Sequence, residues 1–198
     1  MAKLIVIEGP DRVGKATQAD LLYYYLIQRA HTAKLVEVPV KSLLTYRIIY
    51  FMLSTSLAKK FPKIFQWMQW LNKQVFQWLS LRSLEKDYEY LIFDRWSLSS
   101  VIYGKSAGVP EDFVMNLYQR LRTPDYTIVL NGKPHLVGNG DSYEDDTQMQ
   151  ADVRKLYSEW ALQNSDLCTL IDANKSVSDI FNEIIQVLLS KNIIEVNS

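Results

Sequence analysis

The sequence predicts an α/β protein in which helices cover both faces of a five-stranded parallel sheet, giving three layers. Three observations lead to this prediction. Short apolar runs alternate along the chain with longer segments that carry apolar residues at helical spacing. The chain has 198 residues, which is enough for one domain with a full core, and 48% of them are hydrophobic. We therefore expect residues 1–198 to form a single domain.

The expected strands are short runs rich in branched apolar residues. The first is bounded by Gly9 and Pro10, and the second is stopped by Pro39. Because a helical segment follows each strand, we expect crossover connections and parallel pairing. The strands are predicted at residues 4–7, 35–38, 90–93, 127–130 and 168–171.

The expected helices carry apolar residues three or four positions apart. The longest has such a stripe at Phe65, Met68 and Leu71. A polar stretch with three glycines and Pro134, residues 131–142, predicts a loop. The helices are predicted at residues 14–30, 42–54, 62–85, 97–106, 110–122, 144–164 and 176–189.

The charges of the chain balance, with 22 Lys and Arg against 22 Asp and Glu. Such a chain lacks the general positive field that attracts a nucleic-acid polymer, so we expect no such partner and a local anion site. Cys168 is the single cysteine, which excludes an internal disulfide and suits the cytoplasm, or a host's cytoplasm for a viral protein. No apolar run is long enough to predict a membrane span.

Gly9, Gly14 and Lys15 have the spacing of a phosphate-binding loop, and they lie between an expected strand and an expected helix. A glycine turn at a helix start directs backbone N–H groups and the positive end of the helix dipole toward a phosphate. Lys15 is expected to reach the β- and γ-phosphates as a point charge. The alternative is a strand–helix turn with an incidental lysine, and the position between strand and helix argues against it.

Ala16 departs from this pattern, which has Ser or Thr after the lysine to bind Mg²⁺. Mg²⁺ keeps several waters and relies on the phosphates, so the loss of one hydroxyl is tolerable. Asp94 ends an expected strand, where a carboxylate can hold the ion through water. Arg95 beside it can pair two phosphates. A surface ion pair between these two residues is the alternative.

The segment from Glu8 to Gln18 resembles the opening of thymidylate kinases, within the wider nucleoside monophosphate kinase family. Residues 94–103, 141–148 and 171–176 resemble three later segments of that family, in the same order. The resemblance implies a P-loop kinase fold with a short lid at about 131–143. It also implies transfer of a phosphate from ATP, with Mg²⁺, to a nucleoside monophosphate, and a homodimer.

By this resemblance, Arg12 stabilises the transferring phosphoryl group, as in relatives whose lid lacks arginine. Residues 131–142 contain Lys133 and His135 but no arginine, which agrees with this role for Arg12. The resemblance gives catalytic roles to Arg12, Lys15, Asp94 and Arg95. It gives ATP contacts to Gly9, Asp11, Arg12, Val13, Gly14, Lys15, Ala16, Thr17, Asn174 and Lys175.

On the acceptor side, the resemblance assigns Asp11 to the sugar 3′-hydroxyl and Tyr103 to the face of the sugar. Lys41 stands where the family has an arginine for the acceptor phosphate, and a lysine orients a phosphate less strictly. Further acceptor contacts are expected from Arg95, Ser99, Ser100, Tyr143 and Gln148.

Counting back from Asp94 places Trp70 where the family stacks an aromatic residue on the base, with core packing as the alternative. Gln74 takes the place of the arginine that contacts the edge of thymine. Because an amide presents its donor and acceptor in either order, thymine and cytosine both fit. The sequence therefore favours dTMP or a related pyrimidine nucleotide. Three alternatives stay open. The acceptor could carry a modified nucleobase, or it could be a nucleoside, with Glu8 or Asp11 as the general base. The protein could also be a degenerate nucleotide-binding protein.

Two further features bear on assembly and rate. Apolar residues between positions 43 and 81 exceed what a core needs from one helix, which predicts a homodimer through these helices. The expected lid is several residues shorter than in relatives. A short lid excludes water less completely, so slower transfer is expected.

Overall fold

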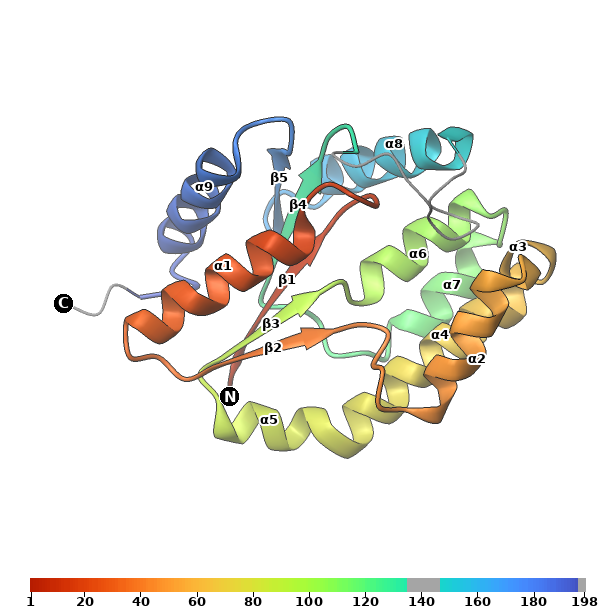
Figure 1. Ribbon diagram of the computed structural model, residues 1–198, viewed down its shortest axis with the longest axis horizontal. Coiled ribbons are helices and arrows are strands. Elements are labelled where there is room, and N and C mark those ends of the chain that lie inside the picture. Colours follow the sequence, from red (N-terminus) through yellow and green to blue (C-terminus); the bar gives the residue numbers. More distant parts are fainter. Residues whose placement is uncertain (135–146, 196–198) are drawn as a thin grey trace.

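The computed structural model describes residues 1–134 and 147–195, and Figure 1 shows their arrangement. A sheet of five parallel strands lies at the centre, in the order β2-β3-β1-β4-β5. Each strand lies within two residues of its predicted bounds, so the predicted sheet is confirmed. The strands are β1 (Lys3–Glu8), β2 (Ala33–Glu37), β3 (Tyr90–Asp94), β4 (Tyr126–Asn131) and β5 (Cys168–Asp172).

The helices follow the predicted order with two differences. The predicted helix at 62–85 is divided by a π-helical turn, where the Gln77 side chain accepts a hydrogen bond from the Arg122 backbone N–H at 2.6 Å. A short helix, α3, was not predicted. The elements are α1 (Lys15–Gln28), α2 (Leu44–Ser54), α3 (Leu57–Lys60), α4 (Pro62–Phe76), the π-helical turn η1 (Gln77–Leu81), α5 (Arg82–Asp87), α6 (Ser97–Ser106), α7 (Glu111–Tyr118), α8 (Thr147–Gln163) and α9 (Val177–Ser190).

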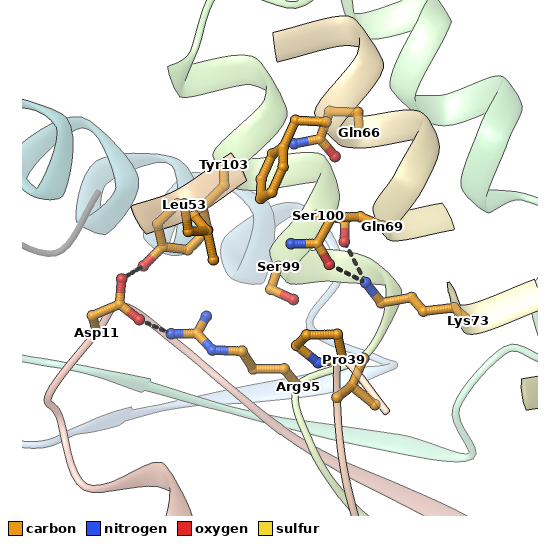
Figure 2. Close-up of a pocket in the computed structure, with 12 residues that line it drawn as sticks. Asp11, Pro39, Leu53, Gln66, Gln69, Lys73, Arg95, Ser99, Ser100 and Tyr103 are labelled. Carbon is orange, nitrogen blue, oxygen red and sulfur yellow. Dashed lines mark hydrogen bonds and ion pairs between the residues drawn. The ribbon is translucent and has the colours of Figure 1, made fainter. Parts of the chain in front are cut away.

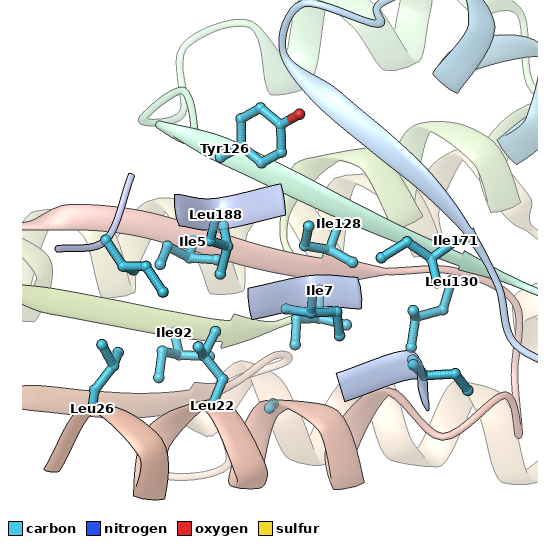
Figure 3. Packing of buried hydrophobic residues seen from close by; sticks show 14 of the residues in the cluster. Ile5, Ile7, Leu22, Leu26, Ile92, Tyr126, Ile128, Leu130, Ile171 and Leu188 are labelled. Atoms are coloured by element: carbon cyan, nitrogen blue, oxygen red, sulfur yellow. The ribbon is translucent and has the colours of Figure 1, made fainter. Parts of the chain in front are cut away.

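Helices cover both faces of the sheet, as predicted. Side chains alternate between the faces along each strand. Ile5 and Ile7 of β1 point to one face, where Leu22 of α1 and Leu188 of α9 pack on them (Figure 3). Leu4 belongs to the core of the opposite face, which α4 to α8 cover. The molecule therefore has three layers.

The carboxyl ends of β1, β3 and β4 meet at one edge of the sheet. Ile7 pairs with Asp94, which sets the end of β1 beside the end of β3. On the other side, a Cβ on Gly9 would lie 2.1 Å from the carbonyl oxygen of Leu130. Only glycine fits this close approach, and its φ of 145° is one that side chains disfavour. Ligands of open parallel sheets bind at this edge.

Residues 135–146 lie outside the described residues. Most of the predicted lid at about 131–143 falls there, together with His135 and Tyr143. In the two described ranges, no helix combines the length and the apolar character that a membrane span requires.

Candidate active site

A loop between β1 and α1 forms the first part of the site. Gly14 precedes the first residue of α1 and has a left-handed backbone, with φ of 87°. Arg12 is also left-handed, at φ of 62°, a conformation that non-glycine residues adopt rarely and often at functional sites. The loop borders a cavity of about 500 Å³. The start of α1 thus faces open space, as an anion site at a helix N-terminus requires.

Lys15 is buried in this loop, and its Nζ donates a hydrogen bond to the carbonyl oxygen of Pro10. Burial and the nearby Arg95 lower the pKa of Lys15 to about 8, against the opposing effect of Asp11. A phosphate at the loop would favour the charged form of Lys15. The lysine is therefore placed to respond to an anion in the cavity.

Arg95 follows β3 and also has a left-handed backbone, with φ of 69°. Its guanidinium donates to the carbonyl oxygen of Gly9 at 3.1 Å and forms an ion pair with Asp11. Burial opposes its charge, but Asp11 raises the pKa of Arg95 well above its usual value. Arg95 borders both the cavity at the loop and a second cavity behind it. A permanent cation thus lies at the junction of two cavities.

Asp94 lines the cavity at the loop beside Arg95. Its Oδ1 is buried and has no hydrogen-bond partner among the described residues. A buried carboxylate oxygen without a partner is costly unless a cation or water occupies the space next to it. Asp94 is therefore suited to a hydrated metal ion.

Asp11 is held from three elements. One carboxylate oxygen pairs with Arg95, and the other accepts from the Tyr103 hydroxyl at 2.5 Å and from Nε2 of Gln150 at 3.0 Å. Burial works against its charge, but Arg95 and Lys15 outweigh burial and lower the pKa of Asp11. Asp11 is thus an ionised carboxylate whose position is set before any ligand binds.

The second cavity, of about 200 Å³, runs from Asp11 and Arg95 toward α4. Figure 2 shows Asp11, Arg95 and Tyr103 at one end and Lys73 at the other. The ring of Phe65 contributes an apolar surface between them. The cavity thus has a charged end near the phosphate loop, an aromatic wall and a polar inner end.

The polar inner end is built around Lys73 of α4, whose residue is only 1% exposed. Its Nζ donates to Oγ of Ser100 at 2.6 Å and to Oε1 of Gln69 at 3.4 Å. It lies 5.5 Å from the centre of the Tyr118 ring. Burial lowers the pKa of Lys73 to about 7, against the opposing effect of Glu8.

Glu8 supports the wall formed by α6. It is fully buried, and one oxygen accepts from the backbone N–H groups of Trp96 (2.8 Å) and Ser99 (3.2 Å) at the start of this helix. The other oxygen accepts from the Tyr157 hydroxyl at 3.0 Å. Burial raises the pKa of Glu8, partly offset by Arg95. Glu8 therefore ties the end of β1 to the helix that carries Ser100 and to α8.

The sequence of the chain matches a known family of kinases. A family model described as thymidylate kinase matches residues 7–184. The chain belongs to the thymidylate kinase family. The thymidylate kinase of Schizosaccharomyces pombe is 27% identical over 211 residues, which cover 98% of this chain and 94% of the relative. That of Plasmodium falciparum is also 27% identical, over 93% of this chain and 88% of the relative.

Solved thymidylate kinases share the fold. The structure from Candida albicans has a TM-score of 0.82 at 22% identity and covers all of this chain and 96% of its own. The structure from Ehrlichia chaffeensis has a TM-score of 0.76 at 21% identity, over 95% and 98% of the two chains. The predicted P-loop kinase fold is thus confirmed.

Most of the residues predicted for this thymidylate kinase family member come together. Gly9 lies at the site through its carbonyl oxygen, which Arg95 binds. The cavity at the phosphate loop is lined by Asp11, Arg12, Val13, Gly14, Lys15, Ala16, Thr17, Asp94 and Arg95. The second cavity is lined by Asp11, Arg95, Ser99, Ser100 and Tyr103, among others.

Trp70 and Gln74, which were predicted to contact the base, do not line the second cavity. The α4 positions that do so are Phe65, Gln66, Gln69 and Lys73, which share one stripe of the helix. A helix turns by about 100° per residue, so the next position along faces elsewhere. Trp70 packs on the core beside the sheet. Phe65 with Gln69 and Trp70 with Gln74 are both an aromatic residue and a glutamine four positions apart. The sequence alone could not distinguish these two pairs.

Lys41 lies outside both cavities. Its side chain is exposed and pairs with Glu37 at 2.5 Å. Gln148 is also exposed and bonds Asp152, whereas Gln150, half a turn later, contacts Asp11. The sequence analysis did not select Gln150. The feature that could have indicated it is its position on the buried face of α8, a helix that begins at the site.

The loop after β5 holds Asn174 and Lys175, which were predicted to contact ATP. Asn174 accepts from the Lys133 backbone N–H at 3.0 Å, and Lys175 pairs with Glu183 at 2.6 Å. Neither lines the cavity at the phosphate loop. Val177 and Ile180 do so instead, and Gln18 of α1 donates to the carbonyl oxygen of Val177 at 3.0 Å. Two apolar residues thus border the cavity at the phosphate loop, next in sequence to the residues predicted to contact ATP.

Proposed function

We propose that this protein transfers the γ-phosphoryl group of ATP to dTMP or a related pyrimidine deoxynucleoside monophosphate. Membership of the thymidylate kinase family gives the reaction class. The observation that carries the proposal is the place of Arg95, which borders both the cavity at the phosphate loop and the cavity with the aromatic wall. A cation between donor and acceptor phosphates stabilises the charge that moves between them.

On the donor side, the phosphate loop and Lys15 bind the β- and γ-phosphates, and Arg12 contributes a second cation from the same loop. Val177 and Ile180 are apolar and also line this cavity, which suits the adenine end of ATP. Asn174 and Lys175 stay predictions for contacts with the adenine.

Mg²⁺ is proposed to accompany ATP, where it would neutralise charge on the phosphates. The buried, unpartnered Oδ1 of Asp94 fits a magnesium-bound water. Ala16 supplies no hydroxyl. Over the described residues, no group of three or more His, Cys, Asp or Glu is placed to hold a metal ion directly. The residues therefore suit an ion carried mainly by phosphates and water.

On the acceptor side, the sugar would lie beside the hydrogen-bonded pair of Asp11 and Tyr103, and the base against Phe65. The nucleophile is a phosphate oxygen that already carries negative charge, so transfer needs no general base. Arg95 holds this phosphate in line with the γ-phosphate of ATP. The roles proposed for Ser99, Ser100 and Gln148, and for Tyr143 outside the described residues, follow the family pattern.

A nucleoside acceptor is less well supported, because its hydroxyl would need a carboxylate base. Glu8 is fully buried, and its oxygens accept three hydrogen bonds. Asp11 is held by Arg95, Tyr103 and Gln150, and its pKa is lowered by Arg95 and Lys15 against the effect of burial. Glu8 lines neither cavity, and Asp11 keeps its charge, so neither carboxylate is placed to take a proton from a ligand.

A coupled assay of ADP release over a panel of nucleoside monophosphates and nucleosides tests the proposal. We expect the highest kcat/KM with dTMP or another pyrimidine deoxynucleotide and no turnover of nucleosides. Binding of ATP without turnover of any acceptor would instead identify a degenerate nucleotide-binding protein.

We further propose a homodimer through α2 and α4. These helices expose several large apolar side chains, among them Tyr50, Phe51, Ile64 and Trp67. The two helices pack against each other, and large apolar side chains exposed on neighbouring helices mark an interaction site. Light scattering at micromolar concentration should give twice the chain mass of 23.0 kDa, and a monomer would contradict the proposal.

Residues 1–198 are proposed to act as one kinase domain, with a lid at about 131–143, in the cytoplasm or a host's cytoplasm. The single cysteine, Cys168, is buried and free, which suits a reducing compartment.

A further inference from the structure

Lys73 is a buried lysine that has no role in the phosphoryl transfer proposed above. It lies at the inner end of the acceptor cavity, opposite the end that holds Asp11 and Arg95 (Figure 2). Burying an ammonium group is costly unless its hydrogen bonds are satisfied. A group that costs stability and borders a ligand cavity calls for a functional explanation.

The contact between Lys73 and Gln69 decides how the amide of Gln69 faces the cavity. A carbonyl oxygen bound beside Lys73 favours its charged form over the neutral amine. This ammonium group has only hydrogens to offer, so the amide oxygen of Gln69 turns toward it, as the 3.4 Å contact between Nζ and Oε1 indicates. The Nε2 donor is then the end of Gln69 that can meet a ligand. Lys73 thereby removes the ambiguity that an isolated glutamine would have.

Two neighbours strengthen this arrangement. Ser100 of α6 accepts a hydrogen bond from Lys73 at 2.6 Å, which anchors the ammonium between two helices. The amide of Gln66 is oriented in the same sense, because its Oε1 accepts from the Tyr118 hydroxyl at 3.0 Å. The inner end of the cavity therefore presents mainly hydrogen-bond donors.

Donors at this end favour a base edge that carries a carbonyl oxygen. A 4-oxo group can accept from Nε2 of Gln69 and from the third N–H of the Lys73 ammonium. A 4-amino group in the same place would bring its own N–H groups against donors and leave all of them unpaired. A site built to bond one polar group rejects the analogue that lacks it by large factors.

We propose that Lys73 is a positioning residue that sets base selectivity. By orienting Gln69 and adding its own donor, it selects pyrimidine deoxynucleotides with a 4-oxo group over those with a 4-amino group. This inference rests on the proposed function and narrows its acceptor from pyrimidines in general to the 4-oxo class.

The test compares kcat/KM for dTMP and 5-methyl-dCMP, which share the methyl group and the sugar and differ at the 4-position edge. Wild type should prefer dTMP by about 100-fold or more. Lys73→Met should lower this preference by about tenfold while leaving the KM for ATP unchanged. Lys63→Met is the matched control, because Lys63 is exposed on the same helix. It should keep the wild-type preference.

Gln69→Glu provides a second variant that keeps a partner for Lys73. Replacing Nε2 with an oxygen removes the donor to the 4-oxo group, so the preference should shift toward 5-methyl-dCMP by at least tenfold. Gln69→Glu keeps the inference testable if Lys73→Met does not fold. An unchanged preference in either folded variant, or a wild type that prefers 5-methyl-dCMP, would overturn the inference but leave a nucleotide kinase. A wild type that binds ATP but phosphorylates neither nucleotide would overturn the proposed function and this inference with it.

Discussion

The two ends of the acceptor cavity are built in different ways. At the phosphate end, the functional groups come from short loops at strand ends, where Asp11 and Arg95 pair with each other. At the base end they come from one stripe of α4, where Phe65, Gln69 and Lys73 face inward. The first end depends on which residues follow a strand. The second depends on the rotational phase of a helix, so a one-residue shift replaces every contact.

Loss of Arg95 should have the largest effect, because it removes the cation at the junction of the two cavities. Arg95→Ala is expected to lower kcat by about 10³-fold or more. The coupled ADP-release assay measures this, with circular dichroism to verify the fold. A variant with full rate would show that the phosphate end does not work through Arg95.

Lys15 makes the phosphate end sensitive to pH. Burial and Arg95 lower its pKa to about 8 in the free protein, and bound phosphates should raise that pKa. Below pH 8 the lysine is charged before and after binding. Above pH 8, ATP binding must take up a proton, and affinity should fall by up to about tenfold per pH unit. Calorimetry at pH 9 in two buffers of different ionisation enthalpy measures the uptake, and equal heats in both buffers would contradict it.

The phase of α4 can be tested with two aromatic substitutions on the same helix. Phe65→Ala should raise the KM for dTMP by about tenfold, because it removes the aromatic wall of the cavity. Trp70→Ala should leave that KM nearly unchanged and lower the free energy of unfolding by about 2 to 3 kcal/mol, because Trp70 packs on the core. A large rise in KM for Trp70→Ala, with little change for Phe65→Ala, would instead indicate that Trp70 stacks on the base.

Lys73 is expected to lower the stability of the fold while it sets the selectivity for the base. Replacing its buried charge by an apolar chain in Lys73→Met is expected to raise the free energy of unfolding by about 1 to 4 kcal/mol. Burial lowers the pKa of Lys73 to about 7 in the folded protein. The gain should therefore be largest below pH 7 and shrink as the pH rises toward the unfolded value. Urea titrations at pH 6 and pH 9 check this, and a gain that grows with pH would contradict it.

The sequence allowed the fold and the phosphate end of the site to be predicted. Strand–helix alternation and the glycine spacing are local patterns, and Asp94 and Arg95 follow a recognisable strand. These features need no knowledge of packing between distant segments. In the structure, Asp11, Lys15 and Arg95 line one cavity at this edge of the sheet, and their roles stay predictions.

The base end could not be predicted in the same way. Counting along α4 chose Trp70 and Gln74 over Phe65 and Gln69, because both pairs have the same spacing and only packing decides the phase. The hydrogen bond between Lys73 and Ser100 joins residues 27 positions apart. Contacts of this kind arise from how two helices pack against each other on one face of the sheet, which no local pattern records.

The measurement that tests the central claim most directly is a product analysis with ATP and dTMP. Chromatography should show dTDP and ADP formed in equal amounts by the wild type, with Arg95→Ala forming both at a rate reduced by about 10³-fold. ADP without dTDP, or no product while ATP still binds, would contradict transfer between the two cavities.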